Sequence, residues 1–158
     1  MGLDPRQRFS KRAVYFAAFR PKYSEALLNY LHERFSFSRR SVIADVGSGT
    51  GILTELLLKN GNVVFGVEPK DDMRGIAEEG LSSYRYFRSI NGSAESTTLA
   101  SNSVDFITAA QSFHWFRPIE TRKEFRRSGA IQGLADRSEC SEPARIARRQ
   151  PDLRRVPL

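Results

Sequence analysis

The sequence contains a single cysteine, Cys140, and only two histidines, His32 and His114, among 158 residues. One cysteine excludes an internal disulfide and a cysteine-rich metal centre, and two distant histidines are too few for a zinc cluster. No apolar run approaches the roughly 18 residues needed to span a bilayer, and the first residues lack the apolar core of a signal peptide. We therefore expect no metal site, no membrane partner and a cytoplasmic protein.

Acidic residues are fewer than basic ones: 18 Asp and Glu against 25 Lys and Arg, which gives a formal net charge of +7. An excess of basic residues permits a nucleic-acid partner, because basic surfaces attract phosphate. Apart from a cluster at positions 6–12 and the pair Arg39 and Arg40, however, the basic residues are scattered among acids. We therefore favour a solvated surface, and a basic nucleic-acid-interaction module stays as an alternative.

The stretch VIADVGSGTGILTELL, residues 42–57, joins a β-branched run to a glycine loop (residues 47–51) and a leucine-rich segment. This order predicts a strand, a turn and the start of a helix. Glycines in the loop can adopt positive φ, so the backbone can approach a small polar or anionic group near a helix N-terminus. A βα turn that binds nothing has the same pattern, so other segments must decide.

Strand and helix patterns alternate along the chain. The expected strands are 42–46, 63–67, 84–90 and 104–110. The first expected helix is 22–35, with Ser24 as its cap, and the second is the leucine-rich segment after the glycine loop, which ends at Asn60 and Gly61. The third helix is capped by Asp71 or Asp72 and ends at Gly80, and the fourth has Pro118 in its first turn. This alternation predicts an α/β fold with a doubly wound, mainly parallel, Rossmann-like sheet. Its ligand crevice is expected at the carboxyl ends of the strands, where the glycine loop falls.

The glycine spacing separates two cofactor classes. The pattern is Gly47-x-Gly49-x-Gly51, and Ile52 stands where a dinucleotide-binding loop has its third glycine. An NAD-binding oxidoreductase is therefore the alternative, not the main hypothesis. Glu68 follows the second expected strand, and its carboxylate can accept two hydrogen bonds from the diol of an unphosphorylated ribose.

Several stretches in order resemble one family, the class I S-adenosylmethionine-dependent methyltransferases with a type 11-like domain. VIADVGSGTG resembles the family's glycine loop, VFGVEPKDDM its ribose acid and adenine-packing segment, and INGSAESTTLASNSVDFITAAQSFHWF its adenine loop and fourth strand. FSKRAVYFAAFRPKYSEAL resembles the N-terminal lid, to which Tyr15 and Arg20 would belong. The resemblance implies an enzyme that binds S-adenosylmethionine and methylates an acceptor, for which the short lid favours a small molecule.

The resemblance also implies individual roles. Asp45 would order the glycine loop and face the methionine end, and Glu68 would hold the ribose hydroxyls. Met73 would pack on the adenine, with a helix-core role as the alternative, and Ser93 stands where many relatives have an acid that accepts from the adenine amino group. The implied cofactor-binding residues are Asp45, Gly47, Gly49, Gly51, Glu68, Met73, Ser93, Ala94 and Gln111.

Two further expectations concern the region after the fourth strand. His114 would be the catalytic base if the acceptor needs one, and packing of residues 114–116 over the pocket is the alternative. From position 128 to 158 the sequence has no aromatic residue and no lysine but six arginines and three prolines. We therefore expect a methyltransferase domain at 1–127 that lacks the family's strands five to seven, followed by an irregular arginine-rich tail at 128–158. The chain after about residue 127 would be truncated or altered, for example by a shifted reading frame. Loss of these strands could leave the enzyme inactive.

Overall fold

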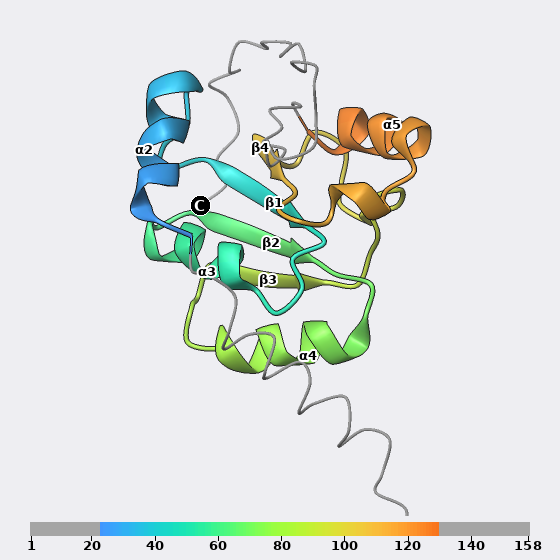
Figure 1. The fold of residues 1–158 in the computed structure, drawn as a ribbon, viewed down its shortest axis with the longest axis horizontal. Coiled ribbons are helices and arrows are strands. Elements are labelled where there is room, and N and C mark those ends of the chain that lie inside the picture. The colour runs from blue at the N-terminus through green and yellow to red at the C-terminus, as the bar shows by residue number, and fades with distance from the viewer. Residues whose placement is uncertain (1–22, 130–158) are drawn as a thin grey trace, which may run out of the picture.

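The computed structural model describes residues 23–129 of the chain. Its centre is a parallel sheet of four strands in the order β3-β2-β1-β4 (Figure 1). The strands are β1 (Val42–Val46), β2 (Val63–Val67), β3 (Phe87–Ile90) and β4 (Phe106–Thr108). The chain therefore runs outward from β1 to β3 and then crosses to the other side of β1, and this reversal opens a crevice at the carboxyl edge.

β1 and β2 form the centre of the sheet. Their near-continuous apolar sequences are typical of parallel strands covered on both faces, and Ile43 and Val64 are fully buried. The pairing places Val46 opposite Val67, so both strands end at the same level. The glycine loop and the acid that follows β2 therefore start side by side.

Four helices and one short turn complete the described residues. They are α2 (Glu25–Arg34), α3 (Ile52–Lys59), α4 (Asp71–Gly80), the 3-10 turn η1 (Phe113–Trp115) and α5 (Pro118–Ser128), and two of the helices, α3 and α4, connect strands. The Ser24 hydroxyl accepts a hydrogen bond from the Ala26 amide at 3.0 Å, which confirms the predicted cap of α2. The predicted cap of α4 is wrong: Lys70 holds that position, and Asp71 and Asp72 lie in the first turn, where their charge favours the helix dipole.

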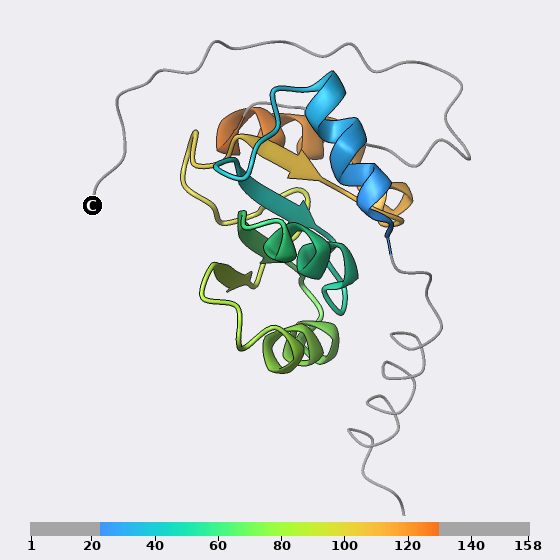
Figure 2. The ribbon, with the colours of Figure 1, turned by 90° about the vertical axis from the view of Figure 1, so that its left-hand side faces the viewer.

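Helices cover both faces of the sheet, which confirms the predicted doubly wound arrangement (Figure 2). One core joins α2, α3 and α4 to the first face, through Leu28, Leu31, Phe37, Ile43, Leu53, Leu57, Leu58, Val64, Ala77, Leu81 and Phe106. The other joins α5 and the loop 91–103 to the second face, through Ala44, Val46, Val67, Ala94, Leu99, Val104, Ile107 and Phe125. Two apolar layers thus fix the strand ends that form the site.

β3 is shorter than the sequence predicts. The expected strand 84–90 begins only at Phe87, because the Phe87 amide donates to the Tyr84 carbonyl and the Tyr84 amide to the Leu81 carbonyl. These bonds form turns between α4 and the strand. The sequence pattern indicated a strand in this segment, but it did not show where pairing with β2 starts.

β4 is also shorter than its expected span of 104–110. Pairing with β1 is confined to residues 106–108, and the backbone then leaves the sheet. Gln111 has a φ of 55°, a left-handed conformation that is uncommon for a residue other than glycine. The apolar run continues through Ala109 and Ala110, so composition alone did not reveal this turn.

The segment just before β4 pairs with the chain as it leaves α5. The amides of Ser103 and Val104 donate to the Ser128 carbonyl at 2.9 and 3.2 Å, and Val104 forms a parallel bridge with Gly129. These contacts join the end of α5 to the start of β4. The predicted domain boundary at residue 127 lies inside α5, and the expected tail lies outside the described residues from position 130 onward.

Candidate functional site

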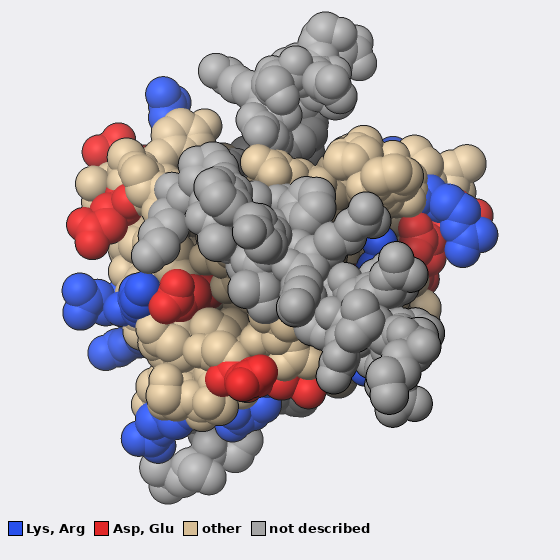
Figure 3. Space-filling model, turned by 60° about the horizontal axis from the view of Figure 1, so that its bottom comes forward, with Lys and Arg blue, Asp and Glu red and all other residues tan. Residues whose placement is uncertain are grey.

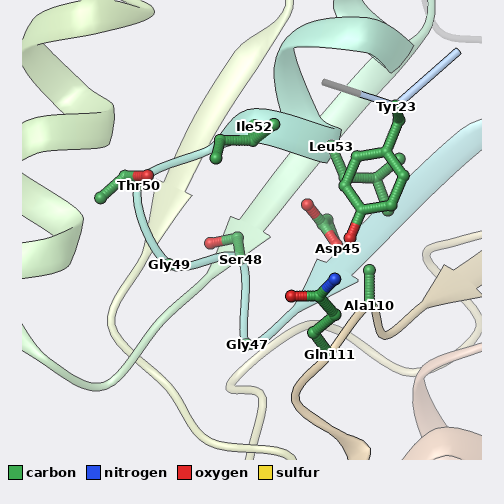
Figure 4. A pocket seen from close by; sticks show the side chains of 10 residues that line it. All are labelled: Tyr23, Asp45, Gly47, Ser48, Gly49, Thr50, Ile52, Leu53, Ala110 and Gln111. Atoms are coloured by element: carbon green, nitrogen blue, oxygen red, sulfur yellow. The ribbon is translucent and has the colours of Figure 1, made fainter. Parts of the chain in front are cut away.

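A pocket opens at the carboxyl ends of β1 and β4, beside the N-terminus of α3 (Figure 4). Ten residues line it: Tyr23, Asp45, Gly47, Ser48, Gly49, Thr50, Ile52, Leu53, Ala110 and Gln111. They belong to the segment before α2, the end of β1, the glycine loop, the first turn of α3 and the loop after β4. The predicted ligand crevice at this edge of the sheet is therefore present.

The glycine loop is bound to the end of β2. The amides of Gly47 and Ser48 both donate to the Val67 carbonyl, at 2.8 and 3.2 Å. Gly51 precedes α3 with a φ of 86°, and a Cβ there would lie 2.7 Å from Leu81 Cδ1. Position 51 therefore needs glycine so that α3 can pack next to the end of α4, and it does not line the pocket.

Gly47 is in direct contact with the loop after β4. Its φ is 70°, and a Cβ at this position would lie 2.5 Å from the Ser112 Cβ. Ser112 is buried, and its hydroxyl donates to the Val46 carbonyl at 3.0 Å. The absence of a side chain at position 47 therefore lets the two loops that enclose the pocket pack against each other.

Asp45 is the buried acid of the pocket, with 2% of its surface exposed. The Thr54 hydroxyl donates to its Oδ2 at 2.6 Å, and the Thr108 hydroxyl donates to its Oδ1 at 3.2 Å. Burial raises the pKa of Asp45 to about 6; the hydroxyls of Thr54 and Thr108 oppose this rise, and the charge of Glu68 adds to it. The side chain therefore changes charge close to neutral pH.

Glu68 follows β2 and is also buried, with 6% of its surface exposed. Its Oε2 accepts from the Gly49 amide and its Oε1 from the Lys70 amide, both at 3.0 Å. Glu68 does not line the pocket itself, but Gly49 does. Each carboxylate oxygen has a second lone pair, so Glu68 can hold the glycine loop and still accept from ligand hydroxyls.

Gln111 reaches the pocket from the loop after β4. Figure 4 shows its amide pointing into the space between the glycine loop and Asp45. Its left-handed backbone turns the chain sharply at the end of the strand. Uncommon backbone conformations of this kind are held by the surrounding structure and are concentrated at functional sites.

Three of the expected cofactor residues lie elsewhere. Met73 is half-buried on α4, Ala94 is 3% exposed within the second core, and Ser93 is half-buried and exchanges backbone hydrogen bonds with Ser96. None of the three lines the pocket. In this conformation Ala94 packs the sheet, and Met73 and Ser93 remain candidates for an adenine surface beyond Glu68.

His114 is exposed in η1 and does not line the pocket. Its ring centre lies 4.9 Å from that of Trp115, which is 79% exposed, and Phe113 is 47% exposed. Phe116 alone turns inward, where its ring meets Phe125 edge-on at 6.4 Å. His114 and Trp115 are thus exposed and do not line the pocket, and both the catalytic role of His114 and the packing of residues 114–116 over the pocket stay predictions.

Sequence reasoning did not identify several pocket residues as site residues: Tyr23, Ser48, Thr50, Ile52, Leu53 and Ala110. Figure 4 shows the Tyr23 hydroxyl pointing toward Asp45. Tyr23 precedes the cap of α2, and its place in the lid-like stretch was the available signal. Leu53 belongs both to the core of the first face and to the pocket lining, because an apolar residue in the first helical turn can contact both.

Within residues 23–129, no group of three or more His, Cys, Asp or Glu side chains is arranged to hold a metal ion. In the same range no helix is long and apolar enough to cross a membrane.

A model of the methyltransferase domain family matches residues 44–135, which is more than half of the chain. The chain belongs to the methyltransferase domain family. A Dictyostelium discoideum protein named as a methyltransferase is 31% identical over 128 residues, 78% of this chain and 47% of that protein. A Mycobacterium tuberculosis protein of the same designation is 32% identical over 108 residues, 68% of this chain and 42% of that protein.

Solved structures of methyltransferases have the same fold. A structure from Anaeromyxobacter dehalogenans, named as a type II methyltransferase, aligns with a TM-score of 0.61 and 31% identity over 70% of this chain and 45% of that chain. This methyltransferase-domain chain thus spans less than half the length of these relatives, and its described part has fewer strands than the complete fold. Family membership implies S-adenosylmethionine as the cofactor and gives the NAD alternative no support.

Proposed function

We propose that this chain binds S-adenosylmethionine in the pocket at the ends of β1 and β4, and that the enzyme methylates a small molecule. One observation carries the proposal: Asp45, Gly47, Gly49 and Gln111, which lie in two segments far apart in sequence, line the same pocket. Family membership supports the identity of the cofactor, and the lining of the pocket supports its proposed position.

The chemistry of the pocket fits this cofactor. S-adenosylmethionine carries a sulfonium and an ammonium group, and Asp45 offers a negative charge inside the pocket. Glu68 stands one hydrogen bond from the glycine loop, where a carboxylate can accept from a ribose diol and repels a 2′-phosphate. No side chain fills the space beside Gly49, where a Cβ would have no neighbour within 4 Å.

The mechanism needs little chemistry from the protein. Asp45, the glycine loop, Glu68 and Gln111 would hold S-adenosylmethionine, which would supply a methyl group on a positively charged sulfur and, as leaving group, a neutral thioether. The residues of the pocket therefore have to align the reactants and exclude water, which can supply most of the rate. Asp45 and Gln111 would orient the methionine end. For an acceptor that must lose a proton, His114 is the proposed base, and it reaches the pocket only if η1 moves inward.

Two observations favour a small acceptor. A structure from Anabaena variabilis that is 28% identical over 68% of this chain is named as a methyltransferase of an antibiotic biosynthesis pathway, whose products are small molecules. The aromatic turn η1 adds an apolar surface at the rim of the pocket, suited to a small organic acceptor. On the face drawn in Figure 3, acidic and basic side chains of the described residues are interspersed, which favours neither nucleic acid nor another polyanion.

Calorimetric titration with S-adenosylhomocysteine tests the proposal. Glu68→Gln is the sharpest variant, since its amide oxygen can still accept from the Gly49 amide, while the charge and the hydrogen bond from the Lys70 amide are lost. We expect about tenfold weaker binding, because a hydrogen bond to a charged group contributes about 1.5 kcal/mol or more. Glu79→Gln, the same change on the exposed face of α4, is the matched control and should bind like the unchanged chain.

A 2′-deoxy analogue of S-adenosylhomocysteine identifies the group that Glu68 binds. If Glu68 accepts from the ribose diol, the analogue and the Glu68→Gln variant lose less in combination than the sum of their separate losses. Additive losses would show that Glu68 acts only on the loop. No binding by the folded, unchanged chain would refute the proposed function. Three further points are separate proposals that this titration does not test. They are turnover by this chain, a cytoplasmic location and a domain boundary at residue 127.

A further inference from the structure

Two threonine hydroxyls converge on the buried acid of the pocket. Thr54 lies in the first turn of α3 and is fully buried, and Thr108 is the last residue of β4 and is 7% exposed. They bind different oxygens of Asp45, Oδ2 and Oδ1. A helix, a central strand and an edge strand are therefore joined at one carboxylate.

The direction of the Thr54 bond is informative. A threonine within a helix commonly bonds the carbonyl of the preceding turn, whereas Thr54 donates across to Oδ2 of Asp45 at 2.6 Å. A hydroxyl that donates to a carboxylate favours its charged form. Thr54 also stands near the N-terminus of α3, where the helix dipole favours a negative charge.

We propose that Thr54 and Thr108 are positioning residues that keep the buried carboxylate of Asp45 charged and aimed at the cofactor, so that removal of either hydroxyl restricts cofactor binding to higher pH. The inference rests on the proposed function and adds two residues to its site. Neither threonine lines the pocket, so both act through Asp45.

The surroundings of Asp45 make its charge sensitive to these donors. Burial acts against the charge and has already raised the pKa of Asp45 to about 6. Glu68, after β2, adds like charge, and the phenol of Tyr23 faces the carboxylate from the segment before α2. Glu55 of α3 pairs with Lys59 at 2.9 Å and accepts from the Tyr84 hydroxyl at 3.3 Å. Thus the two hydroxyls are the side-chain groups that lower this pKa.

The test compares near-isosteric variants across pH. Thr54→Val removes the hydroxyl and keeps the shape, whereas Thr54→Ser keeps the hydroxyl, and Thr108→Val repeats the deletion on the other oxygen. Binding of S-adenosylhomocysteine to the full chain is measured from about pH 5 to about pH 8.

We expect binding by the unchanged chain to weaken as the pH falls through about 6. Each valine variant should move this midpoint upward by about one pH unit, since a hydrogen bond to a charged group corresponds to about one unit or more. At pH 6 binding then becomes about fivefold weaker, and it recovers toward pH 8. The serine variant should keep the original midpoint.

Midpoints that are the same in all four proteins, or valine variants equally weak at every pH, would overturn the proposal. Carboxyl ¹³C NMR titration of Asp45 without ligand separates this failure from failure of the proposed function. If the valine variants raise the Asp45 midpoint but the unchanged chain binds no S-adenosylhomocysteine, the proposed function is refuted and the effect of the hydroxyls on the acid stands. If the Asp45 titration midpoint is the same in the valine variants as in the unchanged chain, the positioning role is refuted, whatever the result of the binding experiment.

Discussion

The two sides of the pocket are built differently. On one side, β1, the glycine loop, α3 and β2 bring together a buried acid, a second buried acid and backbone amides within residues 42–68. On the other side, a strand of three residues leads into Gln111 and an exposed aromatic turn, η1. The first side, the cofactor side, is held mostly by hydrogen bonds between its own residues. The second, the rim side, meets it through the pairing of β4 with β1, the Thr108 hydroxyl on Asp45 and the Ser112 hydroxyl on the Val46 carbonyl, and presents apolar surface outward.

This difference shows how much of a binding site local sequence can determine. The cofactor side lies within one βαβ segment, so its polar groups are fixed by neighbours close in sequence and by two central strands. The rim side depends on an edge strand and on a contact across more than 60 positions, from Ser112 to Val46. We therefore expect substitutions on the cofactor side to alter binding and stability together, and those on the rim side to separate them.

The largest expected effect comes from adding a side chain where the two sides are in contact. Gly47→Ala places a methyl group 2.5 Å from the Ser112 Cβ in a left-handed backbone. Strain and overpacking together should cost about 4 kcal/mol of unfolding free energy and abolish cofactor binding. Urea denaturation measures the loss. Gly49→Ala is the control, since its φ is 56° but no atom lies within 4 Å of the added group, and it should cost about 1 kcal/mol. Equal losses would show that strain alone matters.

Asp45→Asn should alter stability and binding together on the cofactor side, but in opposite directions. Because the pKa of Asp45 is raised to about 6, its native state holds the proton more tightly than the unfolded chain, so its contribution to stability falls between about pH 4 and about pH 6. At pH 7 the variant should be more stable by about 2 kcal/mol, and by 3 kcal/mol at most. Thermal unfolding at pH 7 and at about pH 4 should show the gain only at pH 7, with weaker cofactor binding there. A variant less stable at pH 7 contradicts this account.

The same comparison shows what could be predicted from sequence. Asp45, Gly47 and Gly49 could be found because a strand, a loop and a helix start follow one another in the sequence. All three residues line the pocket. Gly51 was grouped with them by spacing, although its glycine serves the packing on Leu81. The partner hydroxyl of Thr108 could not be predicted, because it comes from a strand that pairs with β1 only in the folded sheet.

Glu124 joins α5, the helix that follows the rim side, to the loop 91–103. Its Oε1 accepts from the Thr97 amide at 2.8 Å and from Arg127 at 2.6 Å, and these donors, Arg127 first, lower its pKa to about 2. Its contribution to stability is therefore present above about pH 4.5 and is lost as the pH falls toward 2. Glu124→Gln should lower the free energy of unfolding by about 1 to 2 kcal/mol at pH 7 and have little effect on cofactor affinity. The loss is modest because Arg127 is 39% exposed, so solvent screens the ion pair.

The measurement for Glu124→Gln is chemical denaturation at pH 7 and near pH 3, where the gap between the proteins should narrow. Glu120→Gln provides a control on the same helix, because its contact with Arg117 is long, at 3.8 Å, and exposed. A difference in unfolding free energy between the variant and the unchanged chain that grows as the pH falls would contradict the predicted pH dependence.

The smallest effect on stability is expected at Trp115. This side chain is 79% exposed, so Trp115→Ala should change the unfolding free energy by less than about 0.5 kcal/mol and leave cofactor affinity within about twofold. It is also the only tryptophan of the chain, so its emission reports on the rim alone. Addition of an acceptor should shift this emission to shorter wavelength, whereas S-adenosylhomocysteine should leave it nearly unchanged. A shift with the cofactor product alone would place Trp115 on the cofactor side.

The contact between Gly47 and Ser112 also constrains how such a chain can diverge. A side chain at position 47 is excluded while Ser112 lies against it, and Ser112 is held there by its bond to the Val46 carbonyl. Drift at one position is therefore tolerated only with compensation at the other, so the two positions should vary as a pair among related sequences. The cofactor loop and the aromatic rim would then be inherited as one unit, even where the acceptors have changed.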